Sequence, residues 1–291
     1  MPELPELETM REVLTSSVLG CAIVSARAYR PGVLKTVDPP LDALVGESFR
    51  SVDRRGKHLL LSCRADLWLV VHLMVAGRLV LTRTATKVTK ATGLVVSLAD
   101  GRDLRLVENG SKKMAQVHVV RGPGDVEGIA RAGVEPLSDD FTCEAAARLL
   151  GADRRQLKKL LTDPSRLAGI RLSRRRALGL AGSAVMVAGV GTWAGRVLLP
   201  EQEAAEIERL HAAIRDVLAE AVARTRRAAG GALVGERRAE GMRVYKRTGE
   251  PCAVCGAPIA EIRFAETRTY YCPQCQSKGR TIADRRAWLR R

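Results

Sequence analysis

The chain has 291 residues and a formal net charge of +16, from 48 Lys and Arg against 32 Asp and Glu. Hydrophobic residues make up 46% and charged residues 27%, close to globular averages, which excludes wholesale disorder. The length allows two domains and a small module. Folding does not require this excess of cationic side chains, whereas binding of a polyanionic partner does. Nucleic acid is the commonest such partner, and an anionic membrane surface is the alternative.

A helix is predicted over residues 3–20, because Leu7, Met10 and Leu14 recur at helical spacing. From about 22 to 122 the pattern changes to short, β-rich runs separated by turn residues, which is typical of an antiparallel sandwich or barrel. The predicted strands are 58–62, 67–75, 93–99, 103–107 and 116–120.

The pattern becomes helical after a Gly-rich segment, 121–128, which we expect to be a loop. The predicted amphipathic helices are 141–151, 154–163 and 201–227, and 228–241 resembles a linker.

Four of the seven cysteines form two close pairs near the C-terminus, Cys252 with Cys255 and Cys272 with Cys275. Each C-x-x-C pair suits a tight turn that directs two thiolates at one ion, and two such turns at the ends of a hairpin complete a tetrahedral S4 site. We therefore predict one structural Zn²⁺, with no open coordination position for catalysis. Basic residues around this module favour DNA contact as well.

Pro2 follows the initiator Met directly, so removal of Met1 would expose a secondary α-amine. An α-amine has a pKa near 8, which leaves a useful fraction unprotonated at neutral pH. Such an amine can attack an aldehydic sugar carbon and form a Schiff base. Glu3 lies beside it as a possible proton donor, and Glu6 could orient the pair.

Three motifs occur together: MPELPELE at 1–8, RRGKHLLL at 54–61, and PCAVCG with YYCPQCQ within 251–276. In this order and spacing they resemble the formamidopyrimidine-DNA glycosylase / endonuclease VIII family. GIARAGVEPL at 128–137 and GMRVYKRTGEPC at 241–252 are also similar to that family.

The resemblance implies an α+β multidomain fold. An N-terminal β-sandwich preceded by a helix would form a catalytic domain, 1–125. A helical domain of helix-two-turn-helix type, altered here, would span 135–235, and a zinc-ribbon hairpin would span 242–291.

The resemblance also implies a bifunctional base-excision repair enzyme. It would flip an oxidised or ring-opened base out of the duplex, cleave the glycosidic bond and nick the strand by β-elimination. Pro2 would be the Schiff-base nucleophile, Glu3 the acid that helps open the sugar, with Glu6 beside them. Lys57 would donate a proton for elimination and contact a phosphate.

Further residues would contact DNA, namely Lys113, Lys158 and Arg268. The family's residues that fill the gap left by the flipped base correspond most closely here to Val75, Lys113 and Met114. Thr267 stands where the family's hairpin usually carries an Arg that assists δ-elimination, and Arg268 is its neighbour. Because a shift of one residue reverses the face of a strand, Arg268 is expected to point away from that position.

The largest departure from the family lies at 171–199, where four arginines precede an uncharged, Gly-rich run at 177–195. Three interpretations are open: a transmembrane helix with a basic flank, a buried helical hairpin in a variant domain, or a local reading-frame disruption. We favour the third, because family-like sequence stops at Ile170 and resumes near Pro200.

We therefore expect a monomeric enzyme that acts on damaged double-stranded DNA in the nucleoid-associated cytoplasm, without a membrane. The alternatives are a non-catalytic zinc-ribbon protein that recognises DNA damage and a membrane-attached protein with a basic face.

Overall fold

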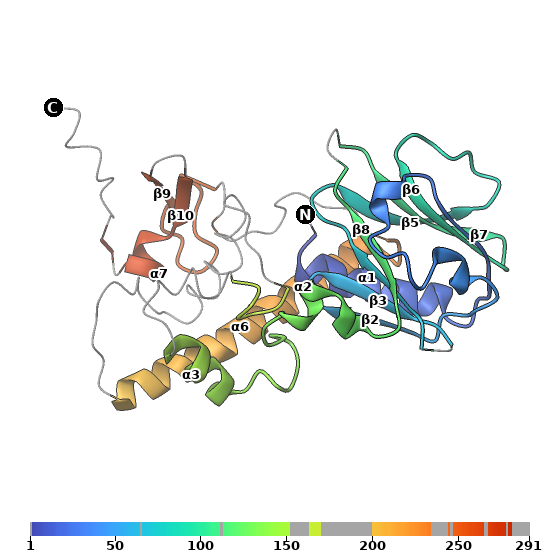
Figure 1. Ribbon diagram of the computed structural model, residues 1–291. Coiled ribbons are helices and arrows are strands. Elements are labelled where there is room, and N and C mark those ends of the chain that lie inside the picture. The colour runs from blue at the N-terminus through green and yellow to red at the C-terminus, as the bar shows by residue number, and fades with distance from the viewer. Residues whose placement is uncertain are drawn as a thin grey trace. The chain divides into compact units, whose positions relative to one another are not determined.

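The protein is described by a computed structural model of the whole chain (Figure 1). The structure describes residues 2–64, 66–110, 113–151, 163–169, 200–233, 244, 247–264, 267–277 and 279–280. The chain forms two compact units. The first comprises Met1–Ala132 with Ala221–Arg237, and the second Gly133–Glu220 with Arg238–Arg291.

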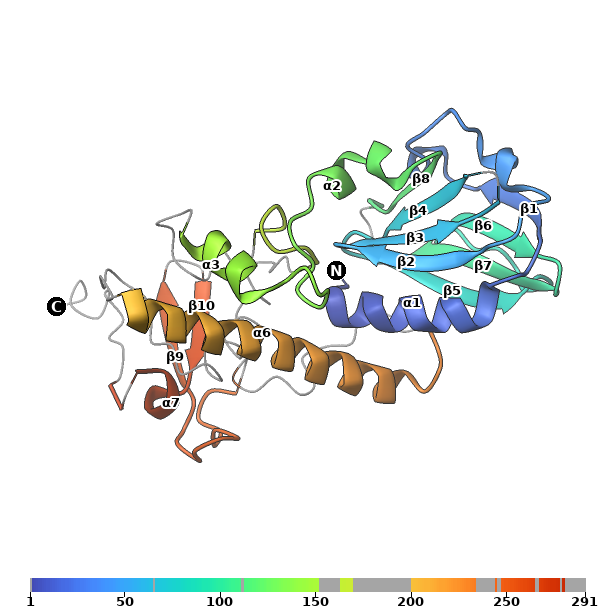
Figure 2. The same ribbon diagram turned by 90° about the horizontal axis from the view of Figure 1, so that it is seen from below.

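The first unit begins with helix α1, Leu4–Val18. The predicted apolar stripe is the buried side of this helix, with Met10 and Leu14 fully buried, so the prediction of a helix at 3–20 is confirmed. Gly20 follows with φ +74°, a left-handed conformation that glycine adopts without strain. The helix runs alongside strand β2 (Figure 2).

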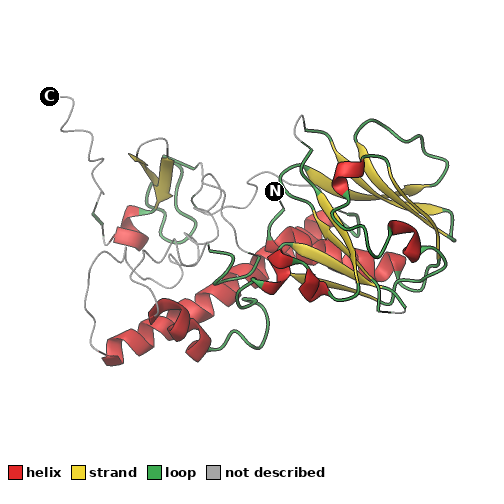
Figure 3. Ribbon diagram, viewed as in Figure 1, coloured by secondary structure: helices red, strands yellow, loops and turns green. Residues whose placement is uncertain are grey.

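Two antiparallel four-stranded sheets follow in this unit (Figure 3). One has the order β1-β6-β7-β5 and the other β2-β3-β4-β8. The strands are β1 Ile23–Ala28, β2 Ser51–Arg55, β3 His58–Ser62, β4 Trp68–His72, β5 Gly77–Arg83, β6 Thr92–Leu98, β7 Arg102–Glu108 and β8 Gln116–Val120. Two short 3-10 helices, η1 Pro31–Val33 and η2 Leu41–Leu44, lie between β1 and β2. The predicted sandwich is confirmed, and all five predicted strands are present.

Strand alternation places the core between the sheets. Leu59, Leu61 and Leu69 belong to the main apolar core, whereas Leu60 belongs to a second cluster with Val126. The second cluster forms where the chain after β8 packs against the sheet. This chain contains η3 Pro123–Asp125 and helix α2 Glu127–Ala130. The loop predicted at 121–128 is therefore corrected: it contains short helical turns, because Val126 and its neighbours have a sheet face to pack on.

The second unit contains helix α3, Cys143–Gly151, strands β9, Ala260–Phe264, and β10, Thr267–Tyr271, and helix α7, Pro273–Ser277. Helix α6, Pro200–Ala229, spans residues of both units. The helices predicted at 141–151 and 201–227 are confirmed. The predicted helix 154–163, with Lys158, and the segment 171–199 lie outside the described residues. Within the described ranges, no helix is long and apolar enough to cross a membrane.

Candidate active site and metal centre

The chain's N-terminal end is held by the first turn of α1. Pro2 is buried, and Glu3 is the N-cap residue, with extended backbone and only 6% of its surface exposed. The backbone N–H of Glu3 donates to the Glu6 carboxylate at 3.0 Å, one half of a capping box. Glu6 therefore fixes the backbone next to Pro2.

Lys57 lies in the tight turn between β2 and β3. Gly56 precedes it with φ +58°, a conformation that a side chain would strain. Lys57 is buried, with 8% of its surface exposed, and it has interaction partners. Burial of a lysine in a turn is uncommon. The position therefore differs from that of a solvated turn lysine.

Two arginines anchor this turn. Arg54 donates from Nε to Glu8 of α1 at 2.9 Å and from Nη1 to the carbonyl of Gly56 at 3.0 Å. Arg55 donates to the carbonyl of Ala132 at 2.9 Å. Burial alone raises the pKa of Glu8, but Arg54 and Arg11 outweigh it and leave the pKa below its ordinary value. The Lys57 turn is thus tied by an ionised pair to α1, the helix that begins two residues after Pro2.

Sequence reasoning missed a histidine cluster beside Lys57. Strand register places His58 of β3 opposite His72 of β4, with ring centroids 4.6 Å apart. Gln116 of β8 is the partner of His72 on the other side, and His118 follows two residues later, on the same face of the sheet. Burial, followed by the positive charge that His118 would carry, lowers the pKa of His58 to about 4. A side chain at Gly128 would collide with this ring, since a Cβ there would lie 2.8 Å from it. His58 is therefore a neutral, closely packed imidazole at neutral pH. The signal in the sequence was that His58, His72 and His118 each lie within a predicted strand.

The three expected gap-filling residues lie at one end of the sandwich. The β4–β5 connection runs from His72 to Gly77, and the β7–β8 connection runs from Glu108 to Gln116. Register pairs His72 with Gln116 and Gly77 with Glu108, so the two connections are next to each other at both ends. Val75, in the first connection, is 59% exposed. Lys113 and Met114, in the second, are also exposed, Met114 to 47%. Strand pairing alone brings these two segments together.

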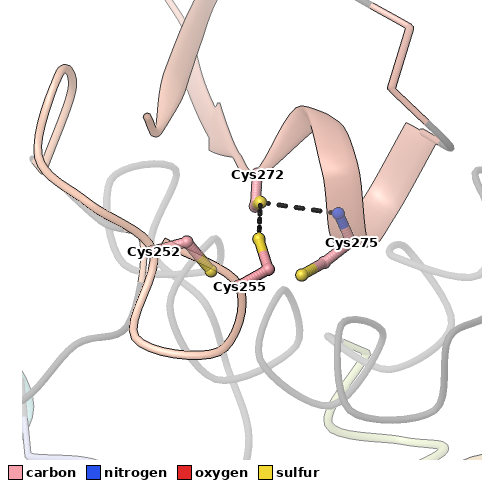
Figure 4. Close-up of side chains that lie close together, drawn as sticks. All are labelled: Cys252, Cys255, Cys272 and Cys275. Carbon is pink, nitrogen blue, oxygen red and sulfur yellow. Dashed lines mark hydrogen bonds between the residues drawn. The ribbon is translucent and has the colours of Figure 1, made fainter. Parts of the chain in front are cut away.

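The four paired cysteines converge in the second unit (Figure 4). Their sulfur atoms all lie within 4.8 Å of one another, and the Sγ atoms of Cys255 and Cys272 are 3.4 Å apart. Each pair sits on a tight turn: the N–H of Gly256 donates to the carbonyl of Cys252, and the N–H of Gln276 to that of Cys272. The backbone N–H of Cys275 also points at the sulfur of Cys272, at 3.5 Å.

This arrangement fits zinc. Four thiolates around Zn²⁺ at a Zn–S distance of about 2.3 Å are about 3.8 Å apart in a tetrahedron, within the spread found here. The donor set is all sulfur, which favours zinc over harder ions. With four thiolates bound the ion has no open position, so its role is structural.

Arg268 lies on the β9–β10 hairpin that carries these cysteines. The register is continuous over five pairs, with Arg268 opposite Arg263. Arg268 is 53% exposed, and its Nε lies 3.5 Å from a carboxylate oxygen of Glu261. The pairing contains no bulge between positions 267 and 268.

Comparisons with known proteins agree with this geometry. The profile of the formamidopyrimidine-DNA glycosylase N-terminal domain matches residues 1–111, and that of the zinc finger found in FPG and IleRS matches 249–278. The chain is 36% identical to formamidopyrimidine-DNA glycosylase of Chloroflexus aggregans, over 95% of this chain and 98% of that protein. The chain belongs to the formamidopyrimidine-DNA glycosylase family.

A further relative, formamidopyrimidine-DNA glycosylase of Symbiobacterium thermophilum, is 33% identical, over 99% of this chain and 93% of its own length. The structure of Lactococcus lactis FPG (MutM) with FAPY-dG-containing DNA superposes with a TM-score of 0.76 at 25% identity, over 94% of this chain and 99% of that one. MutM (FPG) from Thermus thermophilus gives a TM-score of 0.71 at 30% identity, over 95% of this chain and 99% of that one.

Membership in the family confirms several predictions together. The family carries formamidopyrimidine glycosylase and AP lyase activity, so the chain is an enzyme of base-excision repair, as expected in place of a non-catalytic DNA-binding protein. The zinc-finger match and the four-cysteine cluster confirm zinc binding.

Proposed function

We propose that the protein removes oxidised or ring-opened bases through the amine of Pro2 and then nicks the strand by β-elimination. The amine nitrogen of Pro2 would attack C1′ of the deoxyribose while the bond to the base breaks, and Glu3 would supply the proton that helps open the sugar. The resulting iminium makes a C2′ proton acidic. Loss of that proton expels the 3′ phosphate, and Lys57 would donate a proton and contact phosphate.

One observation carries the proposal. Glu3 and Lys57 are both buried polar groups of the same unit, and the Lys57 turn is bound through Arg54 to Glu8 of α1, the helix that begins two residues after Pro2. Burying an amine and a carboxylate costs free energy. Buried ionisable groups are concentrated at functional sites, so the burial of Glu3 and Lys57 supports a catalytic role for them.

The damaged double-stranded DNA would be contacted by Lys113 and Arg268, both exposed cations, and by Lys158, which lies outside the described residues. We further propose that one zinc ion is bound per chain, that the protein acts as a monomer, and that it works in the cytoplasm at the nucleoid. Metal analysis of the purified protein and its mass in solution test the first two points. Imaging a fluorescent fusion tests the third.

Borohydride trapping on DNA with a preformed abasic site tests the nucleophile. The unmodified protein should become covalently linked to the DNA. Pro2→Gly, or extra residues before Pro2, should abolish the linkage, because the reactive secondary amine is lost. Pro5→Ala, at another buried proline of the same helix end, is the control and should still be trapped. Full trapping by the N-terminally extended protein would rule out Pro2.

A further inference from the structure

Glu108 lies at the end of β7, where the connection to β8 begins, and its side chain is completely buried. One carboxylate oxygen accepts the backbone N–H groups of Met114 at 2.8 Å and Ala115 at 2.9 Å. The ammonium group of Lys113 donates to the backbone carbonyl of Glu108. One residue thus binds three consecutive residues at the far end of its own connection.

Arg30 holds the other carboxylate oxygen of Glu108. This arginine follows β1, 78 positions away in the sequence, and its backbone N–H donates to the carbonyl of Gly93 at 3.3 Å. The guanidinium lies against Gly93, where a Cβ would come within 2.8 Å of its nitrogen. The absence of a side chain at Gly93 therefore makes room for the ion pair.

The electrostatic balance keeps this carboxylate charged. Burial by itself raises the pKa of Glu108, but the N–H groups of Ala115 and Met114 and the Arg30 guanidinium outweigh it, so the pKa lies below its ordinary value. Charge-assisted hydrogen bonds of this kind are about twice as strong as neutral ones. The conformation of 113–115 is thus set by a buried anion before any DNA arrives.

We propose that Glu108, anchored by Arg30, is a positioning residue for base extrusion. It holds Lys113 and Met114, side by side at the exposed end of the sandwich, in the conformation that occupies the space left by the extruded base. The inference rests on the proposed function and on the expectation, drawn from the family resemblance, that these two side chains fill that gap. A loop ordered in advance does not spend binding energy on its own ordering, and a misplacement of about 1 Å can cost about 100-fold in rate.

Glu108→Gln tests this role, since it keeps the shape and removes the charge. Excision of a damaged base from duplex DNA should slow by about 10- to 100-fold. Trapping on a preformed abasic site, where no base has to be extruded, should fall much less. The fluorescence of 2-aminopurine placed beside the lesion, which rises when neighbouring bases unstack, should respond more slowly. Arg30→Gln should also slow excision more than it lowers trapping, but by a smaller factor.

Asp103→Asn is the matched control. Asp103 is a buried carboxylate on the same strand, paired with Arg105 at 2.7 Å, and it accepts a hydrogen bond at 2.9 Å from Thr84, in the connection between β5 and β6. It should lower thermal stability without separating excision from trapping. If Glu108→Gln, like Asp103→Asn, lowered excision and trapping to the same extent, Glu108 would have only a structural role, and the proposal would be overturned.

A second test removes the side chains that Glu108 is said to position. In a protein that already carries Lys113→Ala and Met114→Ala, Glu108→Gln should slow excision by less than about threefold, because interacting sites are not additive. A full 10- to 100-fold loss in that background would contradict the proposal. If instead the unmodified protein is never trapped by borohydride, the proposed function fails, and the result is distinguishable from failure of the Glu108 role.

Discussion

The sandwich of the first unit and the cysteine module of the second, residues 247–264 and 267–277, are stabilised by different means. The sandwich has a continuous core of Leu, Val and Ile between two sheets and α1. The module's buried cluster is Val244, Cys252, Ile259, Tyr270 and Cys272, two of which are zinc ligands. Small modules rarely bury enough apolar surface to fold alone. The first unit can therefore fold on its apolar core, whereas the module depends on a bound ion.

Removal of the ion should give the largest difference between the two parts. Cys272→Ser, or chelation, should abolish zinc binding and lower DNA affinity by about 100-fold or more, because metal binding supplies the folding free energy of such modules. The sandwich should keep its cooperative unfolding transition. Zinc content, fluorescence anisotropy with labelled DNA, and thermal unfolding measure the three effects.

Cys63→Ala is the control for this prediction. Cys63 is a buried thiol of the sandwich whose pKa is raised to about 12, first by burial and then by Glu47. Its replacement should leave zinc content and DNA affinity unchanged. An unchanged DNA affinity after verified zinc loss from Cys272→Ser would contradict the role assigned to the module.

The sandwich should instead be sensitive to acid, through His58. Its pKa is about 4 in the folded protein against an ordinary value of 6.5. Between these values the unfolded chain takes up a proton that the folded chain does not, so stability falls as pH drops from about 6.5 to 4. The loss is at most about 3 kcal/mol, and it is complete below pH 4.

His58→Phe should remove the contribution of His58 to the pH dependence of stability. A smaller pH dependence should remain from His118, whose pKa is also lowered, first by burial and then by Lys35. Denaturant unfolding between pH 4 and 7, followed for the sandwich, measures it. An unchanged slope in His58→Phe would show that the imidazole is protonated in the folded state.

The smallest effect is expected on the hairpin. Because position 267 carries a hydroxyl rather than a cation, the enzyme should accumulate the β-elimination product, with an unsaturated aldehyde at the 3′ end. Thr267→Arg should shift the mixture toward a 3′ phosphate, and Arg268→Ala should change it less. Gel separation of the two products measures the ratio. Mainly 3′ phosphate from the unmodified enzyme, lost in Arg268→Ala, would assign the δ-elimination role to Arg268.

Local patterns predicted much of the first unit. The strands at 58–62 and 116–120 have the predicted bounds, since apolar residues and turn residues delimit them. Strands β1, β2 and β5 were not predicted. Their burial is irregular, and β2, with the sequence SVDRR, is mostly polar. These segments form strands because their backbones pair with neighbouring strands, an effect that the β-propensity of the individual residues does not capture.

The chemistry proposed for the two sites could be predicted from the residues alone. A proline at position 2, the RRGK turn and two C-x-x-C pairs are local motifs, and spacing alone allows four thiolates to surround one ion. The contacts that support these sites could not be predicted in this way, because they join residues far apart in the sequence. Arg54 meets Glu8 from 46 positions away, and Arg30 meets Glu108 from 78. Such pairs depend on how the strands are ordered in the sheets, and they become strong only when burial removes water from the charges.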